Sequence, residues 1–338
     1  MQPKIRHLLR LTDSTGMIQH GIYSLPDLET GYTLDDNARA LTVSVQLYER
    51  SGDWKYLKLS EIYLSFLAYA QRPDGRWRNF AGYNRIFLEE CGSEDSFGRA
   101  VQALAPIAAG CKEKNLAAVS RTLLSKAAGQ ISKLSAPRAR AFALAGLAAS
   151  RLLLPQVRQL ADGLVALYKA NSAPGWHWFE DEITYCNGIL PESLLWAWIA
   201  TGEKAYLQVG LESLSHLSDK LLAGDYLQLV GNRGWWKRGR ENPEFDQQPI
   251  DAYHMAQAQL VAWKATGKEE HLEQARRCRR WFEGDNSLGV SLLDPESEGV
   301  YNGLTPSGVN PNQGAESLLA YLLTELAIEK AGQLAEAS

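Results

Sequence analysis

Carboxylic acids stand at the starts of several predicted helices, and two of these groups share one pattern. The adjacent pair Asp35 and Asp36 precedes Arg39 by three or four residues, and Asp95 precedes Arg99 by four. Two carboxyl groups that face each other across a cleft can cleave a glycosidic bond, one as general acid and the other as base or nucleophile. Aspartate is also favoured at helix N-termini, where it accepts hydrogen bonds from unpaired amides. Each acid therefore has a structural alternative as a helix cap.

Two later helix starts carry further polar side chains. Asp251 is followed by His254, and this spacing of three residues places both on one helix face. The histidine could orient the carboxylate or bind a substrate hydroxyl, although a single histidine on a helix is more often structural. Gln313 and Glu316 begin the last predicted helix. Acids and amides are thus predicted to converge from several helices.

Aromatic and amide side chains fill the long segments that lead into these helices. The group comprises Tyr32, Trp77, Trp176, His177, Trp178, Tyr185, Asn187, Trp235 and Trp236. Sugar rings stack on aromatic faces while amides and histidines bond their hydroxyl groups, so this set predicts a carbohydrate-binding surface. The alternative is a set of apolar clusters that pack beneath the long loops.

Helical periodicity predicts the elements that position these residues, and strand-like alternation is rare. The twelve predicted helices span residues 3–11, 36–50, 55–71, 96–110, 116–134, 137–153, 156–170, 190–201, 204–222, 250–266, 269–284 and 314–331. Three tight corners share a helix–Gly–helix pattern, in which the glycine can adopt the left-handed conformation that ends a helix. These corners lie at residues 51–57, 201–207 and 266–272.

Short and long connections alternate along the chain. Long segments precede the helices that begin near residues 36, 96, 190, 250 and 314, whereas the connection before Pro137 is short. In a ring of helical hairpins this alternation places the long loops at one end, which would form a functional face. We therefore predict an all-α (α/α)6 toroid in which residues 1–338 form a single domain. The helix at 3–11 is expected to close the ring against the last hairpin.

Composition excludes several classes of protein. The chain has 338 residues, of which 45% are hydrophobic, so it can bury a large core. Its net charge of −4 and the lack of a concentrated basic face argue against nucleic acid. We find neither a signal-peptide pattern nor a run of ~20 apolar residues, so we expect no membrane association and a cytoplasmic location. The four cysteines lack metal-ligand or disulfide spacing, and we expect no metal and no other cofactor, with Ca²⁺ on loop carboxylates as an alternative.

With these motifs identified, the chain resembles the six-hairpin glycosidase superfamily, whose members are (α/α)6 toroids with a carbohydrate cleft at the N-terminal ends of the inner helices. The Asp-Gly-x-Trp turn at 74–77 and the Trp-His-Trp-Phe segment at 176–179 are similar to segments of that superfamily. Residues 35–41 and 248–252 are similar to bacterial domains found beside or fused to glycosyltransferases, which implies a functional association with such an enzyme. The Tyr-x-x-Asp-Asp-Asn stretch at 32–37 resembles the adjacent aspartates of bacterial endo-α-mannanases, although here it lies at the first inner helix.

We therefore predict a glycoside hydrolase that acts on a bacterial oligo- or polysaccharide, which could contain mannose. The resemblance implies inversion, with Asp36 and Asp251 as the acid/base pair and Asp35 and Asp95 as alternatives. The predicted substrate-binding residues are Tyr32, Arg39, Trp77, Trp176, His177, Trp178, Tyr185, Asn187, Trp235, Trp236, His254, Gln313 and Glu316. A sugar epimerase of the same fold, with facing histidines, and a non-catalytic glycan-binding module remain as alternatives. Acids that face one another in the cleft favour hydrolysis, whereas acids engaged as caps favour binding.

Overall fold

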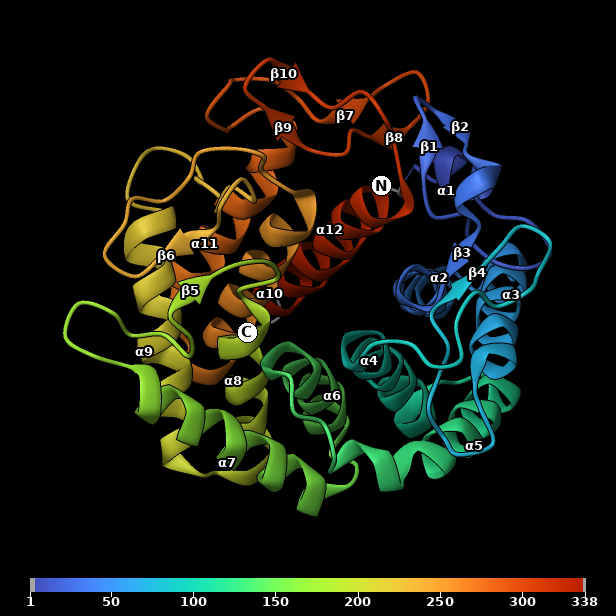
Figure 1. The fold of residues 1–338 in the computed structure, drawn as a ribbon, viewed down its shortest axis with the longest axis horizontal. Coiled ribbons are helices and arrows are strands. Elements are labelled where there is room, and N and C mark those ends of the chain that lie inside the picture. The colour runs from blue at the N-terminus through green and yellow to red at the C-terminus, as the bar shows by residue number, and fades with distance from the viewer. Residues whose placement is uncertain (1–3, 337–338) are drawn as a thin grey trace.

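The computed structural model describes residues 4–336, and within this range the chain forms a ring of α-helices in two layers (Figure 1). The inner helices are α2 (Leu34–Ser51), α4 (Glu94–Gly110), α6 (Pro137–Ser150), α8 (Ile189–Thr201), α10 (Pro249–Thr266) and α12 (Ala315–Glu336). The outer helices are α1 (Arg6–Arg10), α3 (Trp54–Ala70), α5 (Lys114–Ile131), α7 (Leu154–Asn171), α9 (Lys204–Leu221) and α11 (Glu269–Arg280). Each inner helix packs against the next, and α12 packs against α2, which closes the ring. The all-α (α/α)6 toroid predicted from the sequence is confirmed.

The three Gly corners form as predicted. Gly52, Gly202 and Gly267 have φ angles of 69°, 73° and 72° and end α2, α8 and α10. The left-handed conformation directs each backbone amide back to the last turn, and the next outer helix begins two residues later. These hairpins make inner and outer helices antiparallel, so the N-termini of all inner helices lie at one end of the ring.

The inner helices approach closely where their side chains are small. A methyl group added at Gly146 of α6 would lie 2.5 Å from the Cα atom of Gln102 in α4. A methyl group at Gly98 would likewise lie 2.5 Å from the carbonyl oxygen of Ala139. Such contacts exclude larger residues, so glycine and alanine set the spacing of the inner ring.

Short antiparallel strand pairs order the long loops at the N-terminal end of the inner helices. The pairs are β1 (Gly21–Ile22) with β2 (Leu25–Pro26), β3 (Tyr32–Thr33) with β4 (Phe80–Ala81), β5 (Glu182–Ile183) with β6 (Trp236–Lys237), β7 (Leu293–Asp294) with β8 (Gly299–Val300), and β9 (Leu304–Thr305) with β10 (Gly308–Val309). The β3–β4 and β5–β6 pairs join loops that are far apart in sequence. They tie together the loops that enter α2 and α4, and those that enter α8 and α10.

Two details differ from the boundaries predicted from the sequence. α1 covers only Arg6–Arg10, but it packs against α12 as the outer partner of the last hairpin, as expected. Pro3, which the prediction included in this helix, lies outside the described residues. The predicted helix at 269–284 ends at Arg280 and continues as a 3₁₀ turn over Trp281–Glu283. No helix within residues 4–336 is long and apolar enough to cross a membrane.

Candidate functional site

The first turn of α2 fixes the two adjacent aspartates in different roles. Thr33 is the N-cap, and its hydroxyl accepts from the Asp36 amide at 3.1 Å while it donates to Asp36 Oδ2 at 2.7 Å. Asp36 Oδ1 accepts from Arg39 Nη1 at 2.9 Å. Both carboxylate oxygens of Asp36 are therefore engaged within one buried turn. Neither aspartate is the N-cap of α2, because the threonine before the pair takes that role, and Asp36, predicted as one of the acid/base pair, is held inside this turn.

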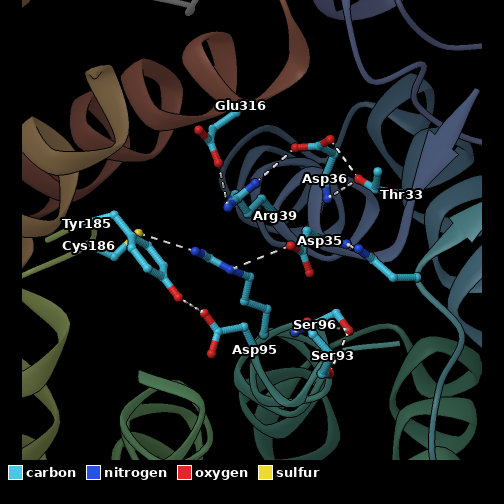
Figure 2. Close-up of polar contacts among 12 residues, drawn as sticks. Thr33, Asp35, Asp36, Arg39, Ser93, Asp95, Ser96, Tyr185, Cys186 and Glu316 are labelled. Carbon is cyan, nitrogen blue, oxygen red and sulfur yellow. Dashed lines mark hydrogen bonds and ion pairs between the residues drawn. The ribbon is translucent and has the colours of Figure 1, made fainter. Parts of the chain in front are cut away.

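Asp35 is the more exposed of the two aspartates, and we call the region around its carboxylate, at the N-terminal end of the inner helices, the opening. Its side chain is 27% exposed, and Oδ2 lies 4.0 Å from Arg99 Nε (Figure 2). Oδ1 has no hydrogen-bond partner among the described residues. Burial raises the pKa of Asp35, while the guanidinium groups of Arg99 and Arg39 oppose this shift. An acid with one free oxygen beside a cation is suited to hold a proton or a water molecule.

Three arginines from consecutive inner helices surround this opening. Arg39 of α2 donates to Glu316 of α12 at 2.9 Å and so links the two helices that close the ring (Figure 2). Arg99 of α4 reaches Cys186 Sγ at 3.2 Å, and its guanidinium lies 3.9 Å from the centre of the Phe142 ring.

The third arginine, Arg138, begins α6. It donates to the carbonyl of Tyr185 at 2.6 Å and to Glu180 at 2.7 Å. The first turn of this helix contains no acid. Glu94 of α4 takes that place and accepts a hydrogen bond from the amide of Ala136 at the start of α6. The short connection predicted before Pro137 is thus capped from the neighbouring helix.

Asp251 of α10 is the second acid with a free oxygen. Its Oδ1 accepts from the Asn187 amide at 3.4 Å, and its Oδ2 is buried without a partner among the described residues. Burial raises its pKa to about 7, and backbone hydrogen bonds from Asn187 and Cys186 and the charge of Arg138 only partly offset this. Asp251 therefore keeps its proton to a higher pH than an ordinary aspartate does.

Asp95, Tyr185 and Trp235 form the rim of the opening. Tyr185 donates to Asp95 Oδ2 at 2.6 Å, and its ring lies 4.7 Å from the Arg138 guanidinium. Trp235 is half-buried with its ring centre 6.4 Å from that of Tyr185. We call the region bounded by these side chains and by Asp35, Arg39, Arg99, Asp251 and Glu316 the mouth.

Most of the aromatic residues predicted to bind sugar lie in the core instead. Trp77, Trp176, Trp178 and Trp236 are at most 7% exposed. The indole nitrogens of Trp77, Trp176 and Trp236 donate to backbone carbonyls, so these rings brace the loops from below. Tyr32 is also buried and donates to Asp13. For these residues the alternative of apolar clusters beneath long loops is correct.

Three polar residues of the predicted site take separate places. His177 contacts Ser172 and His216 of the outer layer and does not face His254. Gln313 is buried against Asp294 and Ser297, away from the mouth. Asn187 is buried, and it connects Arg138 to Asp251 through its side chain and its amide.

His254 lies deeper, against a residue that the sequence analysis did not select. Its Nδ1 is 3.9 Å from Oε2 of Glu192, and both residues are buried. Burial raises the pKa of Glu192 to about 8 and, with the nearby Arg99 and Arg39, lowers the pKa of His254 well below its usual value. A signal was present, because Glu192 is the single charged residue in the apolar helix α8. Arg99 and Arg138 were also missed as parts of the site, although Arg99 stands in the repeated acid–arginine pattern.

No group of three or more histidine, cysteine, aspartate or glutamate side chains within residues 4–336 is arranged to hold a metal ion. The cysteines of this range are free thiols, and Cys186 and Cys278 are buried. Burial raises the pKa of Cys186 to about 12, so this thiol stays protonated beside Arg99.

Comparison with known proteins gives information at the level of the fold. No family model and no curated protein matches the chain. Among solved structures, a sugar epimerase from a ruminal bacterium has a TM-score of 0.73 and 13% identity over 97% of this chain and 95% of its own. Cellobiose 2-epimerase from Bacillus thermoamylovorans has a TM-score of 0.73 and 12% identity over the same shares.

A GH76A alpha-1,6-mannanase from Salegentibacter sp. has a TM-score of 0.61 and 15% identity over 96% of both chains. A variant of this mannanase in which two adjacent aspartates are asparagines is described as inactive and was solved with alpha-1,6-mannotriose. At these identities the likeness concerns the backbone arrangement. Together with the closed ring of helical hairpins, it shows that this chain shares the (α/α)6 toroid fold of these enzymes.

Proposed function

We propose that this protein is a glycoside hydrolase whose reaction takes place at the mouth. One observation carries the proposal: Asp35 and Asp251 are the two aspartates of the mouth that each have a buried oxygen without a partner. A buried carboxylate oxygen is costly to leave unpaired, so it is expected to meet a ligand or a water molecule. Two such acids from different helices around one opening match the requirement of glycoside hydrolysis.

Burial raises the pKa of both acids, and the two differ in the charged group that lies beside each carboxylate. Asp251, whose pKa burial raises to about 7, keeps its proton to a higher pH than an ordinary aspartate does and serves as the general acid for the leaving oxygen. Burial raises the pKa of Asp35 too, but the Arg99 guanidinium beside it opposes this shift, and on the basis of this ion pair we assign Asp35 as the base that activates water. We propose inversion for this pair, as the resemblance implied.

The neighbouring charged residues position this pair. Asp36 and Glu316 both bind Arg39, which holds α2 and α12 in register beside Asp35. Asp95 is engaged by Tyr185. We therefore replace the predicted pair Asp36 and Asp251 with Asp35 and Asp251.

The substrate class follows from the rim and from the fold. Tyr185 is 36% exposed and Trp235 is half-buried beside it, so both offer ring faces on which a sugar can stack. The solved structures of this fold include enzymes named for cellobiose, mannose and α-1,6-mannan. We propose an oligosaccharide substrate and rank mannose-containing glycans first for testing.

The test is a screen of the purified chain against oligosaccharides, α-1,6-mannotriose among them, with product detected by chromatography and its anomer by NMR. Asp35→Asn and Asp251→Asn should each lower kcat by about 10²–10⁴ while substrate still binds. Asp53→Asn is the matched control, because Asp53 caps the outer helix α3 at the other end of the ring and asparagine also caps. Equal product release by all four proteins would refute the assignment. Glycan binding without cleavage by the wild type would favour a binding module.

A sugar epimerase is the second candidate, because the solved epimerases have the higher TM-scores. Such an enzyme moves a proton at a carbon beside a carbonyl group and needs a base. The predicted pair of facing histidines is not formed, which leaves His254 as the one histidine placed to act. Incubation with reducing sugars in D₂O separates the candidates, since an epimerase incorporates deuterium at that carbon and a hydrolase does not.

A further inference from the structure

A cavity of about 190 Å³ lies inside the ring of inner helices, behind the mouth. All six inner helices contribute to its wall. Its deep end is formed by Arg39, Arg99, Glu192 and His254, all within the first two turns of their helices. The two arginines are held by Asp36, Glu316 and Asp35, so the same guanidinium groups border both the mouth and the cavity.

The cavity opens on the face of the toroid opposite to the mouth. Pro106 and Ala149 line it near the C-terminal ends of α4 and α6, and Gln46 lines it in the C-terminal half of α2. All three residues are exposed. Neither Asp35 nor Asp251 contributes to its wall.

The deep end contains buried polar atoms that have no hydrogen-bond partner among residues 4–336. They are Glu192 Oε2, both ring nitrogens of His254, and the Nε atoms of Arg39 and Arg99. Such atoms are rare in folded proteins because an unpaired buried polar group is costly, and their clustering around one cavity indicates a polar occupant. The Glu192 and His254 atoms lie 3.9 Å apart, so one hydroxyl group can bond to both.

We propose that this cavity is a second ligand site, separate from the mouth, that binds one neutral monosaccharide. Gln46, Gln102 and Gln257 line the cavity, and their amides can both donate to and accept from hydroxyl groups. Trp196 supplies an aromatic wall for the C–H face of a sugar ring. The cavity is smaller than the ~300 Å³ at which sites for larger ligands begin, so it holds a single ring.

The charges favour a neutral ligand over an anion. The positive charge of Arg39 is matched by Asp36 and Glu316, and that of Arg99 by Asp35. The carboxyl group of Glu192 would repel an anion if ionised and donate to a hydroxyl if protonated. The site therefore offers mixed donors and acceptors without net positive charge.

The experiment measures the binding of free D-mannose, D-glucose, D-galactose and N-acetyl-D-glucosamine to the full chain by calorimetry and saturation-transfer NMR. Ala149→Trp fills the open end, and Gln257→Leu removes one amide without a large change of volume. Each should weaken the binding of a sugar by about ten-fold or more, the equivalent of one lost hydrogen bond to a buried group. Asp251→Asn at the mouth should change the affinity by less than about two-fold.

Three results would overturn the proposal: no binding by any of the four sugars, binding that survives both cavity variants, or binding lost in Asp251→Asn. Circular dichroism shows whether each variant is folded, and Ala149→Trp at the exposed end is the variant least able to disturb the core. The inference does not depend on hydrolysis at the mouth. If the wild-type chain binds a monosaccharide in the cavity but cleaves no oligosaccharide, the proposed function is refuted and the cavity proposal stands.

Discussion

Thr33 and Asp36 are joined by two hydrogen bonds at the start of α2. The Thr33 hydroxyl accepts from the Asp36 amide and donates to the Asp36 carboxylate. The Thr33 hydroxyl therefore caps the helix and also holds the Asp36 carboxylate, whose Oδ1 accepts from Arg39. Asp35, one residue earlier, is left with a free oxygen at the mouth. A single hydroxyl group thus decides which of two adjacent acids is structural.

Replacing Thr33 with valine tests this relationship. Thr33→Val removes the cap and one donor to a buried carboxylate, so it should lower the free energy of unfolding by about 1–2 kcal/mol. The decrease in the free energy of unfolding should be larger at higher pH. Burial raises the pKa of Asp36 to about 6, and loss of the Thr33 hydroxyl, which lowers that pKa, raises it further. A raised folded-state pKa destabilises the protein as pH rises through it.

The measurement is urea denaturation of Thr33→Val at pH 5 and pH 8. Thr122→Val is the control, because the hydroxyl of Thr122 bonds only to a carbonyl within its own helix on the exposed face of α5. It should change stability by less than about 0.5 kcal/mol. Equal losses for the two variants would contradict the capping role of Thr33.

The pH profile of hydrolysis reports on Asp251. If Asp251 is the general acid, kcat/KM should fall about ten-fold per pH unit above pH 7, because only the protonated form donates and its pKa is raised to about 7. Asp251→Asn should remove this limb together with most of the activity. An activated aryl glycoside, whose leaving group needs no proton, should be cleaved by Asp251→Asn much faster relative to wild type than a natural glycoside. An unchanged alkaline limb in this variant would exclude Asp251 as the acid.

Trp235 and Trp236 are neighbours in sequence with opposite roles. Trp235 is half-buried beside Tyr185 at the mouth, whereas Trp236 is 7% exposed and donates to the Arg240 carbonyl. Trp235→Ala should raise KM or Kd for an oligosaccharide by about two- to ten-fold with little change in Tm, since a stacking contact is worth about 0.5–1.5 kcal/mol. Trp236→Ala should instead destabilise the chain by about 3–5 kcal/mol. Thermal denaturation and affinity measurements on both variants show whether one ring contributes to binding and the other to stability.

Glu192 should make stability depend on pH. Its pKa is raised to about 8 in the folded state from 4.5, so the folded chain keeps a proton that the unfolded chain releases. The contribution is fully present below pH 4.5 and is lost as pH rises to about 8, at about 1.4 kcal/mol per pH unit. Glu192→Gln should lack this pH-dependent contribution to the free energy of unfolding.

The difference in unfolding free energy between Glu192→Gln and wild type, measured by chemical denaturation from pH 4.5 to 8.5, isolates the glutamate from the other buried acids. Stability of the variant relative to wild type should rise with pH over this range. A constant difference would mean that Glu192 is ionised in the folded chain.

The sequence was sufficient to predict the helices and their ring. Apolar periodicity and the corners at Gly52, Gly202 and Gly267 are local properties, since a helix needs only one apolar face and a residue that can end it. The alternation of short and long connections then placed the acids of α2, α4, α10 and α12 at one end. These features are independent of which side chains meet across the ring.

Only the tertiary structure decided what each polar or aromatic side chain contacts. The cap of α2 went to Thr33 because its hydroxyl reaches the Asp36 amide, and this left Asp35 free. Burial of Trp77 and Trp178 depends on how the loops fold over the inner ring, which no local pattern specifies. Glu192 and His254 lie on different helices and meet through packing of the ring. Periodicity determines which face of a helix is buried, but the partner on the facing helix is chosen by the packing of the whole toroid.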